Sequence, residues 1–228
     1  MKHILLPAAL IFALVGCEPK EQQMAAGNNK PPPFATVEEA ANDAKSDLLT
    51  VLRTQKNINL GLDEAAVEKS QPGKPIKHYQ ITFDELVSAE PTIFTKAGNE
   101  IATVVPLVAD NKVVTVAGVG KDAEGWRVAS VVDKGISDDL NLLWRVSQEA
   151  SQGSVTIYDL PHSSVRIYAV TRAGGSIDAP NVIFYTNYPG FNMQEGVEAQ
   201  RLLPPLQRDA AEFQRKYGGE VTNQEVVH

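Results

Sequence analysis

Few side chains in this sequence are arranged as catalytic or metal-binding groups usually are. The single cysteine excludes a cysteine-rich zinc site. Two serines, Ser163 and Ser164, directly follow a histidine, but neighbours in a turn between strands point in different directions, and no Gly-x-Ser-x-Gly motif occurs. We therefore expect neither a zinc enzyme nor a serine hydrolase, since no metal-ligand spacing connects the four histidines, His3, His78, His162 and His228.

Phosphate-binding loops and paired catalytic carboxylates are not expected either. The glycines of Arg172-Ala173-Gly174-Gly175-Ser176 lack the spacing of a Walker or dinucleotide-binding motif and open no helix. Glu38-Glu39 and Asp138-Asp139 lie where we expect helices to start, and negative charge is favourable there. These pairs therefore do not indicate a glycosidase. We expect no cofactor, and an enzyme would need a site assembled from scattered Asp, Glu, Tyr and Arg.

The composition is that of an acidic globular protein. The 228 residues are 43% hydrophobic and 21% charged, enough apolar material for one sizeable core or two small ones. The 28 acidic and 21 basic residues give a net charge of -7. This balance argues against nucleic acid as a partner, because such binders neutralise phosphates with basic side chains.

The first seventeen residues have the layout of a secretory signal. Lys2 supplies a positive start, residues 4–15 are apolar apart from Pro7, and Gly16-Cys17 closes the run. A run this short does not comfortably span the ~30 Å hydrocarbon layer of a membrane.

Leu14-Val15-Gly16-Cys17 resembles the lipobox of bacterial lipoproteins. The resemblance implies that residues 1–16 are removed, that Cys17 is lipidated, and that the protein binds the membrane through this lipid anchor. Glu18 is not the aspartate that marks retention at the inner membrane in that family, so the resemblance implies the periplasmic face of the outer membrane. An ordinary secretory signal with a chance cysteine is the alternative.

Behind the leader, the chain divides into a tether and a folded part. Residues 17–33 are polar and end in three prolines, which is typical of a flexible linker that stiffens toward its end. We expect a globular domain over residues 34–219, with a possible subdivision near residue 134, and a mobile tail over residues 220–228.

The first half of that domain reads as helix followed by strands. A capping box, Thr36 to Glu39, predicts a helix over residues 37–56, and a short helix is expected within 62–69. Asp110-Asn111 predicts a hairpin turn. Pro106 should place its strand at an edge or beside a bulge. The expected strands cover residues 76–81, 101–109, 112–119 and 126–132.

The second half repeats this alternation loosely. Ser137 is expected to cap a helix that Gly153 ends, and strands are expected at 154–160, 164–171 and 182–185. A second capping box, Asn192 to Glu195, predicts the start of the last helix. Pro204-Pro205 should kink or restart this helix, and Gly218-Gly219 should end it.

These elements predict an α+β fold with helices packed on an antiparallel meander sheet. Both halves run helix and then strands, although no residue-level repeat indicates duplication. Residues 36–133, with the strand start Gly125-Trp126-Arg127-Val128, resemble the helix-plus-curved-sheet modules of the cystatin-like superfamily. The resemblance implies binding, since such modules serve as inhibitors, prosegments and ligand carriers, but it names no ligand.

Four aromatic residues are candidates for ligand or partner contact. Trp126 and Trp144 lie in apolar patterns typical of a core, and an open groove on the sheet lined by them would favour a ligand carrier. Tyr188 and Phe191 flank Pro189 and either pack on the core or form an exposed pair for a partner.

The favoured function is a non-enzymatic binding module in the bacterial envelope that holds a protein, peptide or envelope polymer near the membrane. An inhibitor or chaperone-like partner of a secreted enzyme is the alternative, and an enzyme with an unrecognised site is less favoured. The oligomeric state is not indicated by the sequence.

Overall fold

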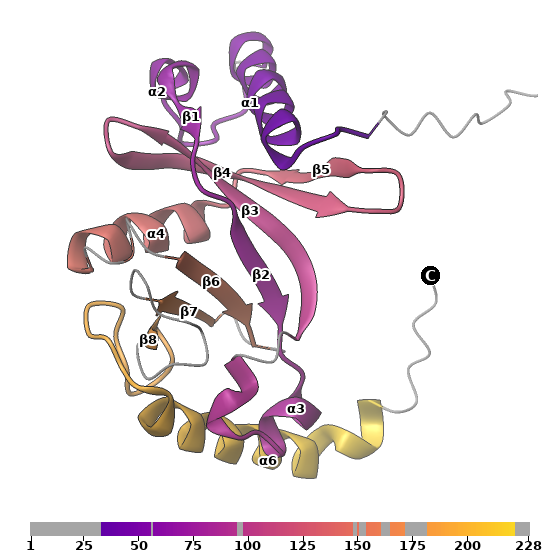
Figure 1. The fold of residues 1–228 in the computed structure, drawn as a ribbon, viewed down its shortest axis with the longest axis vertical. Coiled ribbons are helices and arrows are strands. Elements are labelled where there is room, and N and C mark those ends of the chain that lie inside the picture. The colour runs from indigo at the N-terminus through magenta and orange to yellow at the C-terminus, as the bar shows by residue number, and fades with distance from the viewer. Residues whose placement is uncertain are drawn as a thin grey trace, which may run out of the picture. The chain divides into compact units, whose positions relative to one another are not determined.

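The computed structural model describes residues 33–55, 57–94, 98–147, 150, 154–160, 165–171 and 182–221 (Figure 1). They all belong to a compact unit that begins at Pro32. The leader, Cys17 and the tether before residue 33 lie outside the described residues.

The fold is α+β and is built on one eight-stranded sheet. The strand order is β5-β4-β3-β2-β6-β7-β8, and β1 pairs separately with β3. The expected meander β3-β4-β5 is present. The sheet is mixed, however, because β2 and β6 pair in parallel. The strands are β1 Gln71–Pro72, β2 Ile76–Gln80, β3 Asn99–Ala109, β4 Lys112–Lys121, β5 Trp126–Val131, β6 Ser154–Asp159, β7 Arg166–Thr171 and β8 Val182–Thr186.

The β3–β4 hairpin turns where the sequence predicts it. Asp110 and Asn111 have φ of 51° and 59°, the left-handed conformation that both residue types tolerate. Of the two alternatives predicted for Pro106, the bulge is the one observed: β3 lies inside the sheet, and its register shifts between Leu107 and Val108. The carbonyl of Pro106 accepts a bond of 2.7 Å from Gly73, in the interval between β1 and β2. Pro106 has no N–H to donate, and this donor would point into the interval between β1 and β2, where the ladder of strand hydrogen bonds is interrupted.

The helices are α1 Val37–Thr54, α2 Glu64–Lys69, α3 Phe83–Val87, the 3₁₀ turn η1 Pro91–Phe94, α4 Lys134–Val146 and α6 Ala199–Val221. The predicted capping box of α1 is confirmed, since Thr36 and Glu39 satisfy each other's backbone amides. The sequence analysis missed α3 and η1, although Thr82 and Glu85 form the same kind of box at the start of α3.

The predicted start of α4 is wrong. Asp133 is the N-cap and accepts the amide of Ile136, so the helix starts at Lys134, three residues before Ser137. Asp138 and Asp139 consequently lie beyond the first turn instead of at the helix start. The helix ends at Val146, and Gly153 lies outside the described residues.

The predicted start and end of the last helix are also wrong. Asn192 accepts the amide of Gln194 in a turn, and Val197 then exchanges two backbone bonds with Phe184 of β8. This pairing holds the segment extended, so α6 begins only at Ala199. The helix continues through both prolines and past Gly218-Gly219 to Val221.

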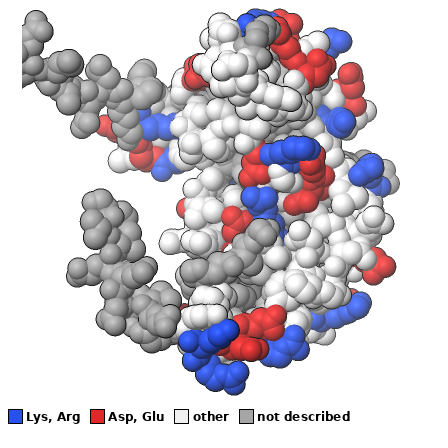
Figure 2. Space-filling view, turned by 180° about the vertical axis from the view of Figure 1, so that it is seen from behind, with Lys and Arg blue, Asp and Glu red and all other residues white. Residues whose placement is uncertain are grey.

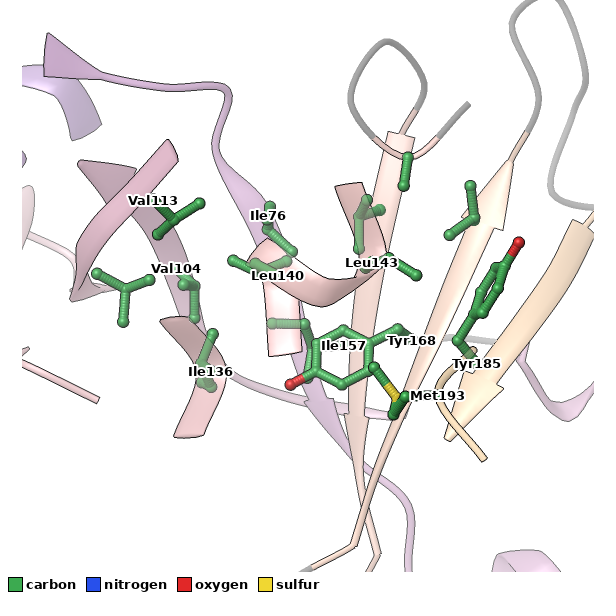
Figure 3. Packing of buried hydrophobic residues seen from close by; sticks show 14 residues of the cluster. Ile76, Val104, Val113, Ile136, Leu140, Leu143, Ile157, Tyr168, Tyr185 and Met193 are labelled. Atoms are coloured by element: carbon green, nitrogen blue, oxygen red, sulfur yellow. The ribbon is translucent and has the colours of Figure 1, made fainter. Parts of the chain in front are cut away.

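Helices cover both faces of the sheet. On one face, α4 packs Leu140 and Leu143 onto strand residues from β3 to β8, with Tyr168 and Ile157 at the centre (Figure 3). On the other face, α1 lies near β3–β5 through a stripe of alanines, Ala40, Ala41 and Ala44. The second face is completed by α3 and α6, which pack over β6–β8 at the opposite end of the molecule from α1 (Figure 1). In the part of the chain that the structure describes, no helix has the length and hydropathy needed to cross a bilayer.

Candidate functional site

A groove of about 430 Å³ lies on the α1 side of the sheet, over β2 to β5. It occupies the part of this face between the strip under α1 and the strip under α3 and α6. Trp126 of β5 is half-buried along it. The remaining lining residues are Lys77, Glu100, Ile101, Ala102, Val119, Gly120 and Lys121.

Strand register brings these distant residues together. Trp126 pairs with Lys121 across β5 and β4, Thr103 pairs with Val119 across β3 and β4, and Lys77 pairs with Thr103 across β2 and β3. A bulge between His78 and Tyr79 shifts the register, so that Tyr79 pairs with Glu100. Glu100 therefore faces the same side of the sheet as Lys77.

The two lysines differ in how their charges are compensated. The Lys77 Nζ donates to Glu100 Oε1 at 2.6 Å, and the same oxygen accepts the hydroxyl of Thr103 at 3.1 Å. Lys121 makes no ion pair with any described residue. The Lys77 and Lys121 ammonium groups lie 6.0 and 5.4 Å from the centre of the Trp126 ring. Lys121 is therefore the cation in the groove that can meet an anionic ligand without breaking a pair.

The backbone of Trp126 is fixed on both sides. Besides its pairing with β4, it exchanges two hydrogen bonds with Phe34, of 2.8 and 2.9 Å. The preceding turn is held by Arg127, which pairs with Asp122 at 2.7 Å and with Glu124. The hydrogen bond to Asp122 is the main cause that raises the pKa of Arg127 above its ordinary value. The groove tryptophan is thus preorganised, and it lies where the tether joins the domain.

The groove lining offers apolar surface and cationic groups for a ligand. Trp126 and Ile101, whose side chain is 46% exposed, offer apolar contact, and the ammonium groups offer donors. Glu100 is the carboxylate among the lining residues, and Lys77 and Thr103 already engage it. This combination suits an extended ligand that alternates flat apolar surfaces with anionic groups.

A second polar cluster lies on the α4 side of the sheet. His78 Nε2 is 3.0 Å from Asp159 Oδ2, Asp159 Oδ1 is 3.3 Å from Arg166 Nε, and Arg166 donates to Asp133 at 3.0 Å. Asp133 also caps α4, so these consecutive polar contacts connect that helix to β2, β6 and β7. Gly135 permits this approach, because a side chain there would meet Arg166 Nη1 at 2.9 Å. We assign the cluster to positioning α4.

Asp139 and Tyr168 form a further pair beside this cluster. The Tyr168 hydroxyl donates to Asp139 Oδ2 at 2.7 Å. Burial raises the pKa of the Asp139 carboxyl and, together with the nearby carboxylate, that of the Tyr168 hydroxyl. In the described residues, no cluster of three or more His, Cys, Asp or Glu has the geometry to hold a metal ion.

The aromatic residues singled out from the sequence have different environments. Trp126 lines the groove, whereas Trp144 packs against the core under α4. Tyr188 is only 8% exposed, and its hydroxyl donates to Asp209. Phe191 is half-buried, and its ring lies 5.9 Å from the Arg201 guanidinium. Tyr188 therefore belongs to the core, and a partner contact stays a prediction for Phe191.

The other residues considered for chemistry are not brought together. His78 joins the α4 cluster, and Asp138 pairs with Lys134 at 2.6 Å. His162, Ser163 and Ser164, the glycine-rich segment and the predicted lipidation site Cys17 lie outside the described residues. Figure 2 shows basic and acidic side chains side by side in small clusters on the visible face, with no continuous basic surface there.

Lys77, Glu100 and Lys121 are groove residues that the sequence analysis did not identify. They come from three strands, and each looks like an ordinary exposed strand residue in its own segment. Only Trp126 carried a signal, as an aromatic residue at the start of an expected strand.

No family model, no curated protein and no solved structure matches this chain. The likeness of the leader to lipoproteins and that of residues 36–133 to cystatin-like modules stay predictions.

Proposed function

We propose that this protein is a non-enzymatic binding lipoprotein of the bacterial envelope, anchored through Cys17 to the periplasmic face of the outer membrane. Its groove at Trp126 binds a carboxylate-bearing glycan–peptide polymer, the chemistry of the bacterial cell wall. The observation that carries the proposal is a half-buried tryptophan beside two lysine ammonium groups, which lie 5.4 and 6.0 Å from the centre of its ring.

The ligand class follows from the groove's chemistry. A sugar ring presents a flat C–H face that packs on an indole, and a carboxylate of the attached peptides can pair with Lys121, whose charge no described residue compensates. A long polymer also suits a site formed across four strands, which is open along its length.

The position of the groove fits an anchored protein. Phe34, the first residue paired with Trp126, is separated from Cys17 by the tether. Seventeen extended residues reach at most ~60 Å. A lipidated Cys17 would hold the groove within that distance of the membrane.

Co-sedimentation with purified peptidoglycan tests the groove. The mature chain from residue 17, with Cys17→Ser, should bind, and Trp126→Ala and Lys121→Glu should each weaken binding about tenfold or more. Lys69→Glu on α2 is the charge-matched control and should bind as the parent does, because Lys69 does not line the groove. Equal binding by all variants, or no binding by the parent, would contradict the proposed ligand.

Metabolic labelling with a fatty-acid analogue tests the anchor separately. Cys17→Ala should abolish incorporation and leave an uncut or differently cut chain, because no other cysteine can accept the lipid. Undiminished labelling of this variant would overturn the lipoprotein assignment.

A further inference from the structure

Glu100 is the one acidic residue in the lining of the groove, and its presence there needs a reason. The other charged lining residues are Lys77 and Lys121, so two positive charges meet one negative charge. The adjoining turn holds its own charges in pairs, between Arg127 and both Asp122 and Glu124. A groove that bound only carboxylates would gain from a neutral residue in place of Glu100, because this acid repels anions and occupies Lys77.

The ion pair between Lys77 and Glu100 is accessible to a ligand. The side chains are 48% and 39% exposed, and Lys77 Nζ lies 2.6 Å from Glu100 Oε1. The two residues come from the neighbouring strands β2 and β3, and the bulge after His78 brings Glu100 to the groove side of the sheet. A molecule in the groove can therefore reach both charges.

Both partners of the pair keep capacity for further hydrogen bonds. Glu100 Oε1 accepts Lys77 and, at 3.1 Å, the hydroxyl of Thr103, whereas Oε2 accepts no bond from any described residue. The Lys77 ammonium has three N–H donors, and its contacts with Glu100 and, at 3.5 Å, with Thr103 use two of them. The pair thus offers a ligand one carboxylate oxygen and one N–H donor.

Such a pair is complementary to a second pair of opposite charges in reverse order. A ligand carboxylate can accept a bond from Lys77 while an ammonium on the same carbon atom donates to Glu100 Oε2. The free head of an amino acid, with its α-carboxylate and α-ammonium, has this arrangement. Lys121 stays available for a further carboxylate of the ligand.

We propose that the Lys77–Glu100 pair selects a zwitterionic amino-acid head, and that Lys121 binds a second carboxylate of the same peptide. This inference rests on the proposed function, since it assigns a specificity to the same groove. When two peptides of a wall polymer are cross-linked, the ammonium becomes an uncharged amide and no longer pairs with Glu100. The groove therefore prefers peptide ends that are not cross-linked.

A muropeptide with and without its free amine tests this selection. The probe is the disaccharide–tripeptide that a muramidase releases from diaminopimelate-containing peptidoglycan, because its last residue carries an ammonium beside a carboxylate. Acetic anhydride in aqueous bicarbonate converts this ammonium into an amide and leaves the carboxylates. In calorimetric titration of the mature chain with Cys17→Ser, the acetylated probe should bind at least about fivefold more weakly than the free-amine probe.

Glu100→Gln should remove the preference. Glutamine keeps the shape of the side chain, loses the charge that attracts an ammonium, and leaves Lys77 free to meet a carboxylate. The variant should bind the acetylated probe at least about twofold more tightly than the parent does, and the two probes within about twofold of each other. Its melting temperature should stay close to that of the parent, because exposed ion pairs contribute little to stability.

Glu68→Gln on α2 is the charge-matched control. Glu68 is 62% exposed, pairs with Arg53 and does not line the groove, so this variant should keep the parent's preference for the free amine. Loss of the preference in this control as well would show that net charge decides the binding, and would overturn the role of Glu100.

The remaining outcomes separate this inference from the proposed function. Equal binding of both probes by the parent, or binding of intact peptidoglycan but of neither probe, would leave the proposed function standing and overturn the selection. A preference that survives in Glu100→Gln would also overturn the role of Glu100. Binding of neither the probes nor intact peptidoglycan would contradict the proposed function and the selection together.

Discussion

Phe34 and Trp126 donate their backbone amides to each other's carbonyls, at 2.8 and 2.9 Å. At the start of the described residues, the chain thus forms a short antiparallel pairing with β5, a strand at the edge of the sheet. This pairing also covers part of a strand edge that would otherwise be open to other chains. Phe34 therefore belongs to the domain, and the compact unit also includes Pro33, which the sequence analysis assigned to the tether.

Truncation should locate this boundary. A chain starting at Pro33 should melt within a few degrees of one starting at Glu18, because residues 18–32 are mostly polar or proline and offer few side chains for a core. A chain starting at Val37 loses the Phe34 bonds and the Thr36 cap and should be ~2–3 kcal/mol less stable. Thermal unfolding followed by circular dichroism measures both. A low melting temperature for the Pro33 chain would assign the tether a stabilising role.

Gly196→Ala should destabilise the protein. A Cβ at this position would lie 2.3 Å from Ile183 Cγ2 and 3.2 Å from the Tyr185 hydroxyl, so β8 or the bridge to Val197 must shift. The expected cost is about 1–3 kcal/mol in urea unfolding. Gly120→Ala is the control, since nothing lies within 4 Å of its added Cβ, and it should be neutral or slightly stabilising. Equal stability of both variants would show that the chain relaxes freely around residue 196.

Asp139→Asn should raise stability modestly at pH 7. Burial raises the pKa of this carboxyl in the folded protein, so its stability contribution is present in acid and is lost as the pH rises from the ordinary value of 3.8 through the raised value. Asparagine carries no charge to bury, and its side-chain oxygen can still accept the hydrogen bond from the Tyr168 hydroxyl. The advantage of the variant should shrink as the pH falls below the ordinary value of 3.8, because Asp139 then becomes protonated in both the folded and the unfolded state. Urea unfolding from pH 3.5 to 7 measures this difference, and a less stable variant at pH 7 would mean that attraction to Arg166 dominates.

Tyr158, Tyr168 and Tyr188 should resist ionisation in alkali. Burial is the main cause that raises the pKa of each hydroxyl above the ordinary 10.0. Because the folded state holds these protons more tightly, stability should fall as the pH rises above 10. In a spectrophotometric titration, these three tyrosine hydroxyls should ionise only when the protein unfolds cooperatively. Tyr188→Phe should remove one of these late-ionising groups, and smooth ionisation of all tyrosines before unfolding would contradict the burial argument.

Local signals in the sequence predict local structure well until a distant partner competes. The box at Thr36–Glu39 and the turn at Asp110-Asn111 involve neighbours only, and both are confirmed. The box at Asn192–Glu195 fails because Val197 pairs with a strand thirteen residues earlier. The box that starts α3 was present in the sequence, but the period of the surrounding strands concealed a helix of five residues.

The groove could not be predicted, because its chemistry depends on register. Lys77, Glu100 and Lys121 approach Trp126 only after three strands align, and the bulge at His78 decides which face Glu100 occupies. Neither the parallel pairing of β2 with β6 nor that bulge has a marker within its own segment.

The parallel pairing of β2 with β6 also sets the order in which the molecule can be completed. Lys77 of β2 pairs with Thr156 of β6, which lies about eighty residues later in the chain, so β2 gains this neighbour only after β6 has been synthesised. A polypeptide emerging amino end first can form the β3–β4–β5 meander early, but the centre of its sheet stays open on one side. Export in an unfolded state is therefore compatible with this topology, since the central strand closes only after most of the chain has crossed.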